Sequence, residues 1–230
     1  MIGALGRLAS ALALLGTMGG LVVGLIALAY SLVARNAARA RSIAVGMASG
    51  LSLYAAALVL VSLASRERSL GFDQERFFCG LDCDLAYSVV GVRTARALGP
   101  QAAASRAHGV YHVVSVRVRS DAAQARIDPN EPRAYVLSEG GRYFPVSSLG
   151  QGALERAESR SESWDQPLDP GASYTKDLVF DLPVGIRKPR LVISEGGWMT
   201  RLVIGDENSF LHRKTVFRLD DPPPSARSGV

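Results

Sequence analysis

Acidic residues are missing from the first 65 residues of this 230-residue chain. The charged side chains in that stretch are Arg7, Arg35, Arg39 and Arg41. Subtracting these four from the 26 basic residues leaves 22 against 21 acidic residues in 66–230, so most of the formal net charge of +5 lies in the N-terminal quarter. The rest of the chain is nearly neutral, which excludes the broad basic surface of a nucleic-acid-binding protein.

Cysteine, histidine and aromatic residues are also scarce. The chain has two Cys and three His, and aromatic residues make up 7%. Two cysteines exclude a disulfide-dense small scaffold. The sequence contains no Gly-x-Ser-x-Gly elbow, His-Glu-x-x-His pair, P-loop or dinucleotide fingerprint. We therefore expect a protein that is not an enzyme and that holds neither a cofactor nor a metal.

Apolar sequence without charge is abundant. One uncharged run covers the 27 residues Leu8–Ala34, and a second covers the 24 residues Ser42–Ser65. A helix needs roughly 20 residues to cross the hydrocarbon core of a bilayer. Buried core helices of this length are rare in so small a chain, and no small-x-small cleavage site marks the first run as a signal peptide. Residues 1–65 are therefore predicted to form a two-span transmembrane hairpin with a turn from Arg35 to Arg41.

The flanking arginines predict an orientation for this hairpin. Arg35, Arg39 and Arg41 crowd the short turn, whereas Arg7 and Arg66 are spread outside it. Short loops rich in Arg stay in the cytoplasm. We therefore expect an integral protein of the inner (plasma) membrane, with the bilayer as its first partner and with both termini and the C-terminal domain extracytoplasmic.

Glycines recur at four-residue spacing within both runs, at Gly16, Gly20 and Gly24 and at Gly46 and Gly50. This spacing places them on one helix face, where small residues allow two backbones to approach. The pattern predicts a helix-packing seam between the two spans or between protomers, and the alternative is chance in a Gly- and Ala-rich stretch. A seam between chains would suit a structural subunit of a larger membrane complex.

Beyond the hairpin, hydrophobicity alternates with a period of two. Residues 110–119 predict one long strand, with Tyr111, Arg117 and Arg119 on an outward face that could meet a partner. Gly-containing turns at 139–142 and 195–197 predict two hairpins, and residues 151–160 a short helix. Further strands are predicted at 87–92, 134–137, 143–146, 174–181, 190–194, 198–204 and 215–219.

This count and spacing predict the fold class: an N-terminal transmembrane α-helical hairpin followed by an all-β antiparallel immunoglobulin-like sandwich. The predicted domains are the hairpin at 1–65, a juxtamembrane connector at 66–84, the sandwich at 85–220 and a disordered tail at 221–230.

Two stretches, Gly109–Ala122 and Leu168–Pro183, resemble the bacterial immunoglobulin-like domains of unknown function. Such domains occur in surface lipoproteins and membrane-anchored proteins. The resemblance covers about residues 105–205 and implies an extracytoplasmic, anchored sandwich without known catalysis. It favours a binding or assembly module that meets a protein partner in the membrane or cell envelope. The two-span hairpin and the segment 77–84 depart from the family's pattern.

Cys79 and Cys83 are four residues apart within that segment. In an oxidising compartment such a pair predicts a local disulfide, and free thiols or a metal or redox site are the alternatives. Binuclear copper sites also use Cys-x3-Cys, but they require a His and a Met just after the second Cys, where this chain has Asp84-Leu-Ala-Tyr87. This departure argues against a binuclear copper site. If the two cysteines nevertheless form a metal or redox site, the alternative function is a copper- or redox-handling accessory protein that uses Cys79 and Cys83.

Overall fold

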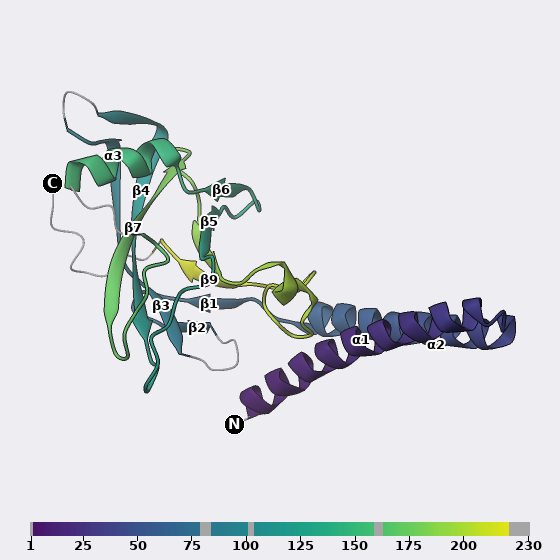
Figure 1. Ribbon diagram of the computed structural model, residues 1–230. Coiled ribbons are helices and arrows are strands. Elements are labelled where there is room, and N and C mark those ends of the chain that lie inside the picture. The colour runs from purple at the N-terminus through teal and green to yellow at the C-terminus, as the bar shows by residue number, and fades with distance from the viewer. Residues whose placement is uncertain (1, 79–83, 101–103, 159–162, 221–230) are drawn as a thin grey trace. The chain divides into compact units, whose positions relative to one another are not determined.

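The computed structural model describes residues 2–78, 84–100, 104–158 and 163–220, without the side chains of residues 2–8 and 198. Two long apolar N-terminal helices precede a two-sheet β-sandwich, so the predicted fold class is confirmed (Figure 1). The chain forms two compact units. The helical unit comprises residues 1–66 and 197–213, and the sandwich unit comprises residues 67–196 and 214–230.

The helical unit contains α1 (Ile2–Val33) and α2 (Ala37–Ala64). Both helices are long and apolar enough to cross a membrane, with mean hydropathy of 2.3 over 9–33 and 2.0 over 37–64. None of the first stretch is buried within the protein, and 6% of the second is. The two helices pack along part of their length, where Gly24 lies against Met47.

The turn between the helices is shorter than predicted. It covers residues 34–36 instead of 35–41, and α2 already contains Arg39 and Arg41. Asn36 begins α2 because its side-chain oxygen accepts a hydrogen bond from the Arg39 N–H at 3.0 Å. Arg35 adopts a left-handed backbone, with φ at 51°, which reverses the chain within this turn.

The sandwich unit has two sheets. One contains, in order, β1 (Arg68–Leu70), β9 (Thr215–Arg218), β8 (Arg190–Ser194), β5 (Arg133–Leu137) and β6 (Tyr143–Pro145). The other contains β2 (Arg76–Phe78), β3 (Leu85–Leu98), β4 (Ser105–Ser120) and β7 (Ser173–Leu182). Neighbouring strands pair antiparallel except β1 and β9, which are parallel.

The second predicted hairpin is wrong. Residues 190–194 form β8, but Trp198–Leu202 form a 3-10 helix, followed by turns, in the helical unit. Gly196 takes a left-handed backbone with φ at 97°, and its N–H bonds to the Asn130 carbonyl at 2.8 Å. The first hairpin, β5–β6, forms as predicted, and the predicted connector at 66–84 contributes β1 and β2.

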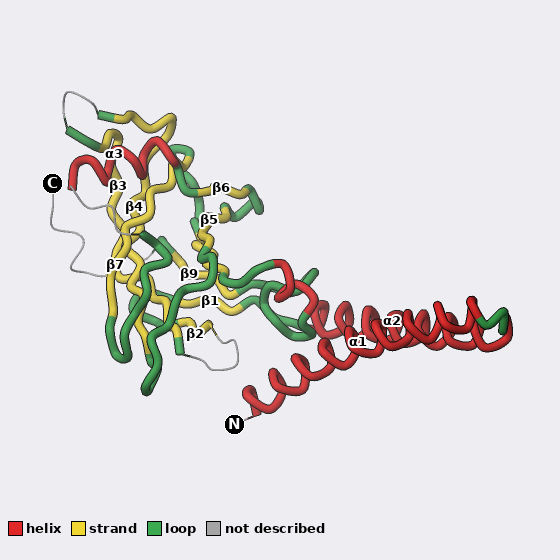
Figure 2. Tube along the Cα trace, in the orientation of Figure 1, coloured by secondary structure: helices red, strands yellow, loops and turns green. Residues whose placement is uncertain are grey.

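The sandwich core lies between the sheets, where alternate residues of β4 point inward. Val114, Val116 and Val118 are fully buried there among residues of both sheets. The other face of β4 was expected to be exposed, but α3 (Ser148–Glu158) covers part of it, as Figure 2 shows beside β4 and β7. Tyr111 is consequently 1% exposed in a second cluster with α3, which removes it from any partner surface.

The close pairing of β4 with β7 makes Gly109 intolerant of a side chain. A Cβ at this position would lie 2.0 Å from the Leu182 carbonyl oxygen, which belongs to the backbone and cannot turn away. We expect Gly109→Ala to lower the free energy of unfolding by roughly 2–4 kcal/mol. Gly91→Ala is the matched control, because its Cβ would meet the Ser115 side chain at 3.8 Å, an ordinary contact.

Urea denaturation of the full chain in detergent, followed by Trp164 fluorescence in a Trp198→Phe background, measures both variants. Equal stability of the Gly109→Ala and Gly91→Ala proteins would contradict the packing described here.

Candidate functional site

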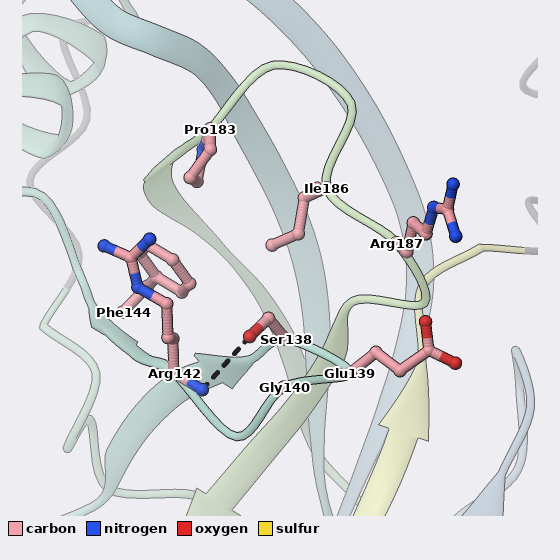
Figure 3. A pocket seen from close by; sticks show the side chains of 8 residues that line it. All are labelled: Ser138, Glu139, Gly140, Arg142, Phe144, Pro183, Ile186 and Arg187. Atoms are coloured by element: carbon pink, nitrogen blue, oxygen red, sulfur yellow. Dashed lines mark hydrogen bonds between the residues drawn. The ribbon is translucent and has the colours of Figure 1, made fainter.

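Two turns of the sandwich enclose a surface groove of about 440 Å³. One is the β5–β6 hairpin turn, in which the Gly141 N–H donates to the Ser138 carbonyl at 2.9 Å. The other is the β7–β8 connection, in which the Ile186 N–H donates to the Pro183 carbonyl at 3.2 Å. The lining residues are Ser138, Glu139, Gly140, Arg142, Phe144, Pro183, Ile186 and Arg187 (Figure 3).

The groove combines an apolar floor with a charged rim. Figure 3 shows Ile186 pointing into the space, with Pro183 and Phe144 on its other sides. The Arg142 guanidinium lies 5.6 Å from the centre of the Phe144 ring, a cation–π contact that keeps its charge beside the floor. Arg187 stands at the opposite end. This arrangement suits a ligand with an apolar group and a negative charge.

Polar contacts hold the two walls of the groove together. The Glu139 N–H donates to the Arg187 carbonyl at 3.4 Å, and Lys188 Nζ lies 2.8 Å from Glu139 Oε1. The carboxylate of Glu139 is therefore balanced by Lys188, which leaves the two rim arginines to set the sign of the local field. The groove is preformed by backbone bonds across its two turns.

A second cavity, of about 410 Å³, lies beside α3 and includes Gln151, Glu155 and Lys176 among its lining residues. These polar groups bind the protein itself: Lys176 Nζ lies 3.1 Å from Glu155 Oε1, and the Gln151 amide donates to the Asp177 carbonyl at 3.0 Å. They fasten α3 to β7, so the groove between the two turns is the better candidate for binding.

A largely buried polar cluster links the two sheets. The Tyr87 side chain is fully buried, and its hydroxyl donates to a Glu195 carboxylate oxygen. Arg76, 6% exposed, donates to the Ile193 carbonyl at 2.5 Å and lies 4.1 Å above the Phe78 ring. This cluster joins the two sheets, since Arg76 and Tyr87 belong to one and Ile193 to the other.

Burial raises the pKa of the Glu195 carboxyl to about 7. Hydrogen bonds from Tyr87 and the Asn130 backbone, and the positive charge of Arg76, oppose this rise without cancelling it. Burial, followed by the charge of Glu195, also raises the pKa of the Tyr87 hydroxyl, so this hydroxyl stays protonated and acts as a donor. Glu195 immediately follows β8, in a Glu-Gly-Gly triplet whose composition is typical of a turn, so its pairing with Tyr87 could not be predicted from the local sequence.

The predicted site residues lie in different parts of the chain, and the structure describes only some of them. Cys79 and Cys83 lie outside the described residues, so the disulfide stays a prediction. Of the predicted packing glycines, Gly24 contacts Met47, whereas positions for a Cβ at Gly16, Gly20, Gly46 and Gly50 have nothing within 4 Å. Contacts of those four with another chain stay a prediction. Arg35 and Arg39 are exposed at the helical turn, as is Arg41 in the first turns of α2.

Histidines do not form a metal site in the part of the chain that the structure describes, where no group of three or more His, Cys, Asp or Glu could hold an ion. His108 Nδ1 lies 3.2 Å from Asp181, and burial lowers the pKa of His112. The His108 side chain is 92% exposed, and the His112 side chain is half-buried in β4.

The chain is a two-sheet β-sandwich that carries a surface groove and is preceded by two long apolar helices. No protein-family model and no curated protein matches the sequence. Solved structures with a similar fold include the secreted protein MPT63 from Mycobacterium tuberculosis, with 11% identity, a TM-score of 0.42 and coverage of 66% of this chain and 98% of that one.

An uncharacterised β-sandwich protein from Clostridium difficile is similar with 9% identity, a TM-score of 0.40 and coverage of 68% of this chain and 96% of that one. A conserved hypothetical protein from Bacillus anthracis matches with 10% identity, a TM-score of 0.41 and coverage of 54% and 88% respectively. At these levels the similarity is one of fold.

The raised pKa of Glu195 predicts a pH-dependent stability. The folded protein holds the carboxyl proton up to about pH 7, whereas the ordinary value is 4.5, so this proton stabilises the fold fully below pH 4.5. The stabilisation falls as the pH rises between these two values, by about 3 kcal/mol in total. We expect Glu195→Gln to remove this slope, because its amide cannot titrate and its oxygen still accepts from Tyr87.

Denaturation of the full chain at pH 5.0, 6.0, 7.0 and 8.0 measures the slope, with Glu131→Gln, exposed on the surface, as the control that keeps it. A Glu195→Gln protein with the same slope as the unmodified chain would refute the assignment.

Proposed function

We propose that this chain is an integral membrane protein whose two helices anchor an extracytoplasmic, non-catalytic sandwich that binds an acidic protein partner in the membrane or cell envelope. One observation carries the proposal: the surface of the helices is apolar and uncovered by the protein itself. Leu25, Ile26, Leu53 and Leu60 are between 57% and 74% exposed. An uninterrupted apolar surface of this kind requires a covering, and a bilayer provides one that matches the length of the helices.

The charges at the helical turn support one orientation. Three arginines lie close together at this end of the helices. Arg35 is in the three-residue turn, and Arg39 and Arg41 are in the first turns of α2. At the other end of α2, Arg66 and Arg68 are interrupted by Glu67. The positive-inside rule then favours a cytoplasmic turn, with the sandwich on the opposite side of the membrane.

Thiol labelling in intact cells tests this orientation. In a Cys79→Ser/Cys83→Ser background, we expect Ser148→Cys, at the exposed start of α3, to react with a membrane-impermeant maleimide, and Ala34→Cys to react only after the cells are opened. Denatured samples labelled in parallel control for the amount of each variant. Labelling of position 34 with protection of position 148 would reverse the orientation, and labelling of both in intact cells would contradict a membrane-spanning hairpin.

The groove between the β5–β6 and β7–β8 turns supports a binding role. Its eight lining residues include no His, Cys or Asp, and the Ser138 hydroxyl accepts a hydrogen bond from the Arg142 N–H at 3.0 Å. The Glu139 carboxylate, which could act as a base, pairs with Lys188, so these contacts do not join a nucleophile to a base. Its apolar floor and its rim of Arg142 and Arg187 fit a protein segment that presents an apolar side chain beside a carboxylate.

Photo-crosslinking from the groove tests this role. With p-benzoylphenylalanine at position 186, we expect a discrete crosslinked protein in native membranes, and we expect Arg142→Glu with Arg187→Glu to reduce its yield at least tenfold by repelling an acidic partner. Arg133→Glu, an equally exposed charge reversal on β5, is the matched control and should leave the yield unchanged. Equal loss in the control, or no effect of the paired reversal, would sink the role of the groove.

A further inference from the structure

Residues 197–213 interrupt the sandwich and join the helical unit. The chain leaves the sandwich unit after Gly196 and returns to it at Lys214, so β8 and β9 are separated by this excursion although they pair directly. A two-residue turn would suffice to connect two antiparallel strands. A segment of this length therefore requires a reason outside the sandwich.

The segment packs along one face of α2. The Tyr54 hydroxyl donates to the Leu202 carbonyl at 2.6 Å, and the Ser62 and Ser209 hydroxyls lie 3.3 Å apart. Tyr54 and Ser62 are eight residues apart, and Leu58, midway between them, is 7% exposed. Residues spaced by four share a helix face, so the segment covers this face along about 12 Å of helix.

The C-terminal end of α2 has two further neighbours in the segment. A Cβ at Gly205 would lie 3.7 Å from Val61, and the Arg213 N–H donates to the Ser65 hydroxyl at 2.8 Å. Ser62 is fully buried where its hydroxyl meets that of Ser209.

Part of the backbone of the segment is hydrogen-bonded within the segment. Successive turns run through it. In each turn an N–H donates to the carbonyl three residues earlier, at 3.0–3.3 Å, and the donors are residues 200, 203, 206, 209 and 212. Side chains add to the series, since the Asn208 N–H donates to Asp206 Oδ1 at 2.7 Å and the Ser209 hydroxyl to the Asp206 carbonyl at 2.6 Å. Internal pairing of this kind is what a chain needs where water is scarce.

Large apolar side chains nevertheless remain on the surface of this segment. Met199, Phe210 and Leu211 are 61%, 54% and 65% exposed. Leu211 also holds a left-handed backbone, with φ at 65°, which costs free energy in any residue with a Cβ. The structure thus keeps these apolar groups outward although the chain has a sandwich core available to bury them.

The position along α2 indicates what covers them. Arg39 and Arg41 mark one membrane interface, and about 20 residues of helix from Ser42 onward fill a hydrocarbon core, which ends near Val61. Ser62 and Ser65 then lie at headgroup level, and Tyr54 lies in the outer half of the core. The segment that contacts all three lies in the same leaflet.

We propose that residues 197–213 form a membrane-interface element, in which Met199, Phe210 and Leu211 contact the lipids of the outer leaflet. The same end of α2 also presents apolar side chains, since Leu60 and Leu63 are 66% and 62% exposed. Arg213, exposed on the same segment and bonded through its N–H to Ser65, supplies positive charge for lipid phosphates at the rim. The element rests on the proposed membrane insertion of α2.

Photo-crosslinking to lipid tests the element in the full chain, reconstituted in nanodiscs of phosphatidylethanolamine and phosphatidylglycerol. With p-benzoylphenylalanine at position 210, we expect lipid-modified peptides by mass spectrometry, at a yield within about threefold of a probe at position 53, a 74% exposed site on α2. A probe at position 149, 66% exposed on α3 of the sandwich, is the matched control and should give at least tenfold less.

The outcomes separate the element from the anchor. Lipid adducts at position 53 with none at position 210 would overturn the element and leave the membrane anchor intact. No adduct at position 53 would overturn both. A covalent dimer from position 210 in place of a lipid adduct would assign the surface to a second copy of the chain. In a Met199→Ser/Phe210→Ser/Leu211→Ser variant, we expect the yield of lipid adducts at position 53 to stay unchanged, because α2 would insert without the element.

Discussion

The structure depends first on the apolar surface of α1 and α2. A soluble protein buries such a surface in its core, but 0% and 6% of the two apolar stretches are buried here. The sandwich does not need this surface, since its own core is complete around Val114, Val116 and Val118. The chain therefore contains one apolar surface that is buried within the protein and a second, on the two helices, that the protein itself leaves uncovered.

Composition was sufficient to predict the helices and most of the strands. Long uncharged runs leave few alternatives for residues 1–65, and the period of two in residues 110–119 predicts β4 because one face must reach the core. The turn at 34–36 is shorter than predicted, because the Asn36 cap lets α2 begin at Ala37, before Arg39 and Arg41. Burial of Tyr111 could not be predicted, since it depends on where α3 lies.

The errors concentrate where tertiary contacts override local pattern. Residues 198–204 have the composition of a strand, but Leu202 instead bonds to Tyr54, 148 residues earlier in the chain. Glu195 has the surroundings of an exposed turn in sequence, yet it is paired with buried Tyr87, 108 residues away. Neither pairing leaves a local signal, because each partner is an ordinary residue for its own segment. The groove was missed for the same reason, since its walls are two turns separated by more than 40 residues.

The single parallel pair of strands follows from how the chain is routed. Both β1 and β9 begin a few residues after a segment of the helical unit ends, at Arg66 and Arg213. The Arg213 N–H is already bonded to the Ser65 hydroxyl, so these two stretches leave the helical unit side by side. Two strands that depart together run in the same direction, and Arg68 pairs with Thr215 accordingly. The excursion of residues 197–213 thus accounts for the parallel exception among the described strands, because it returns the chain to the sandwich beside the point where the chain first entered it.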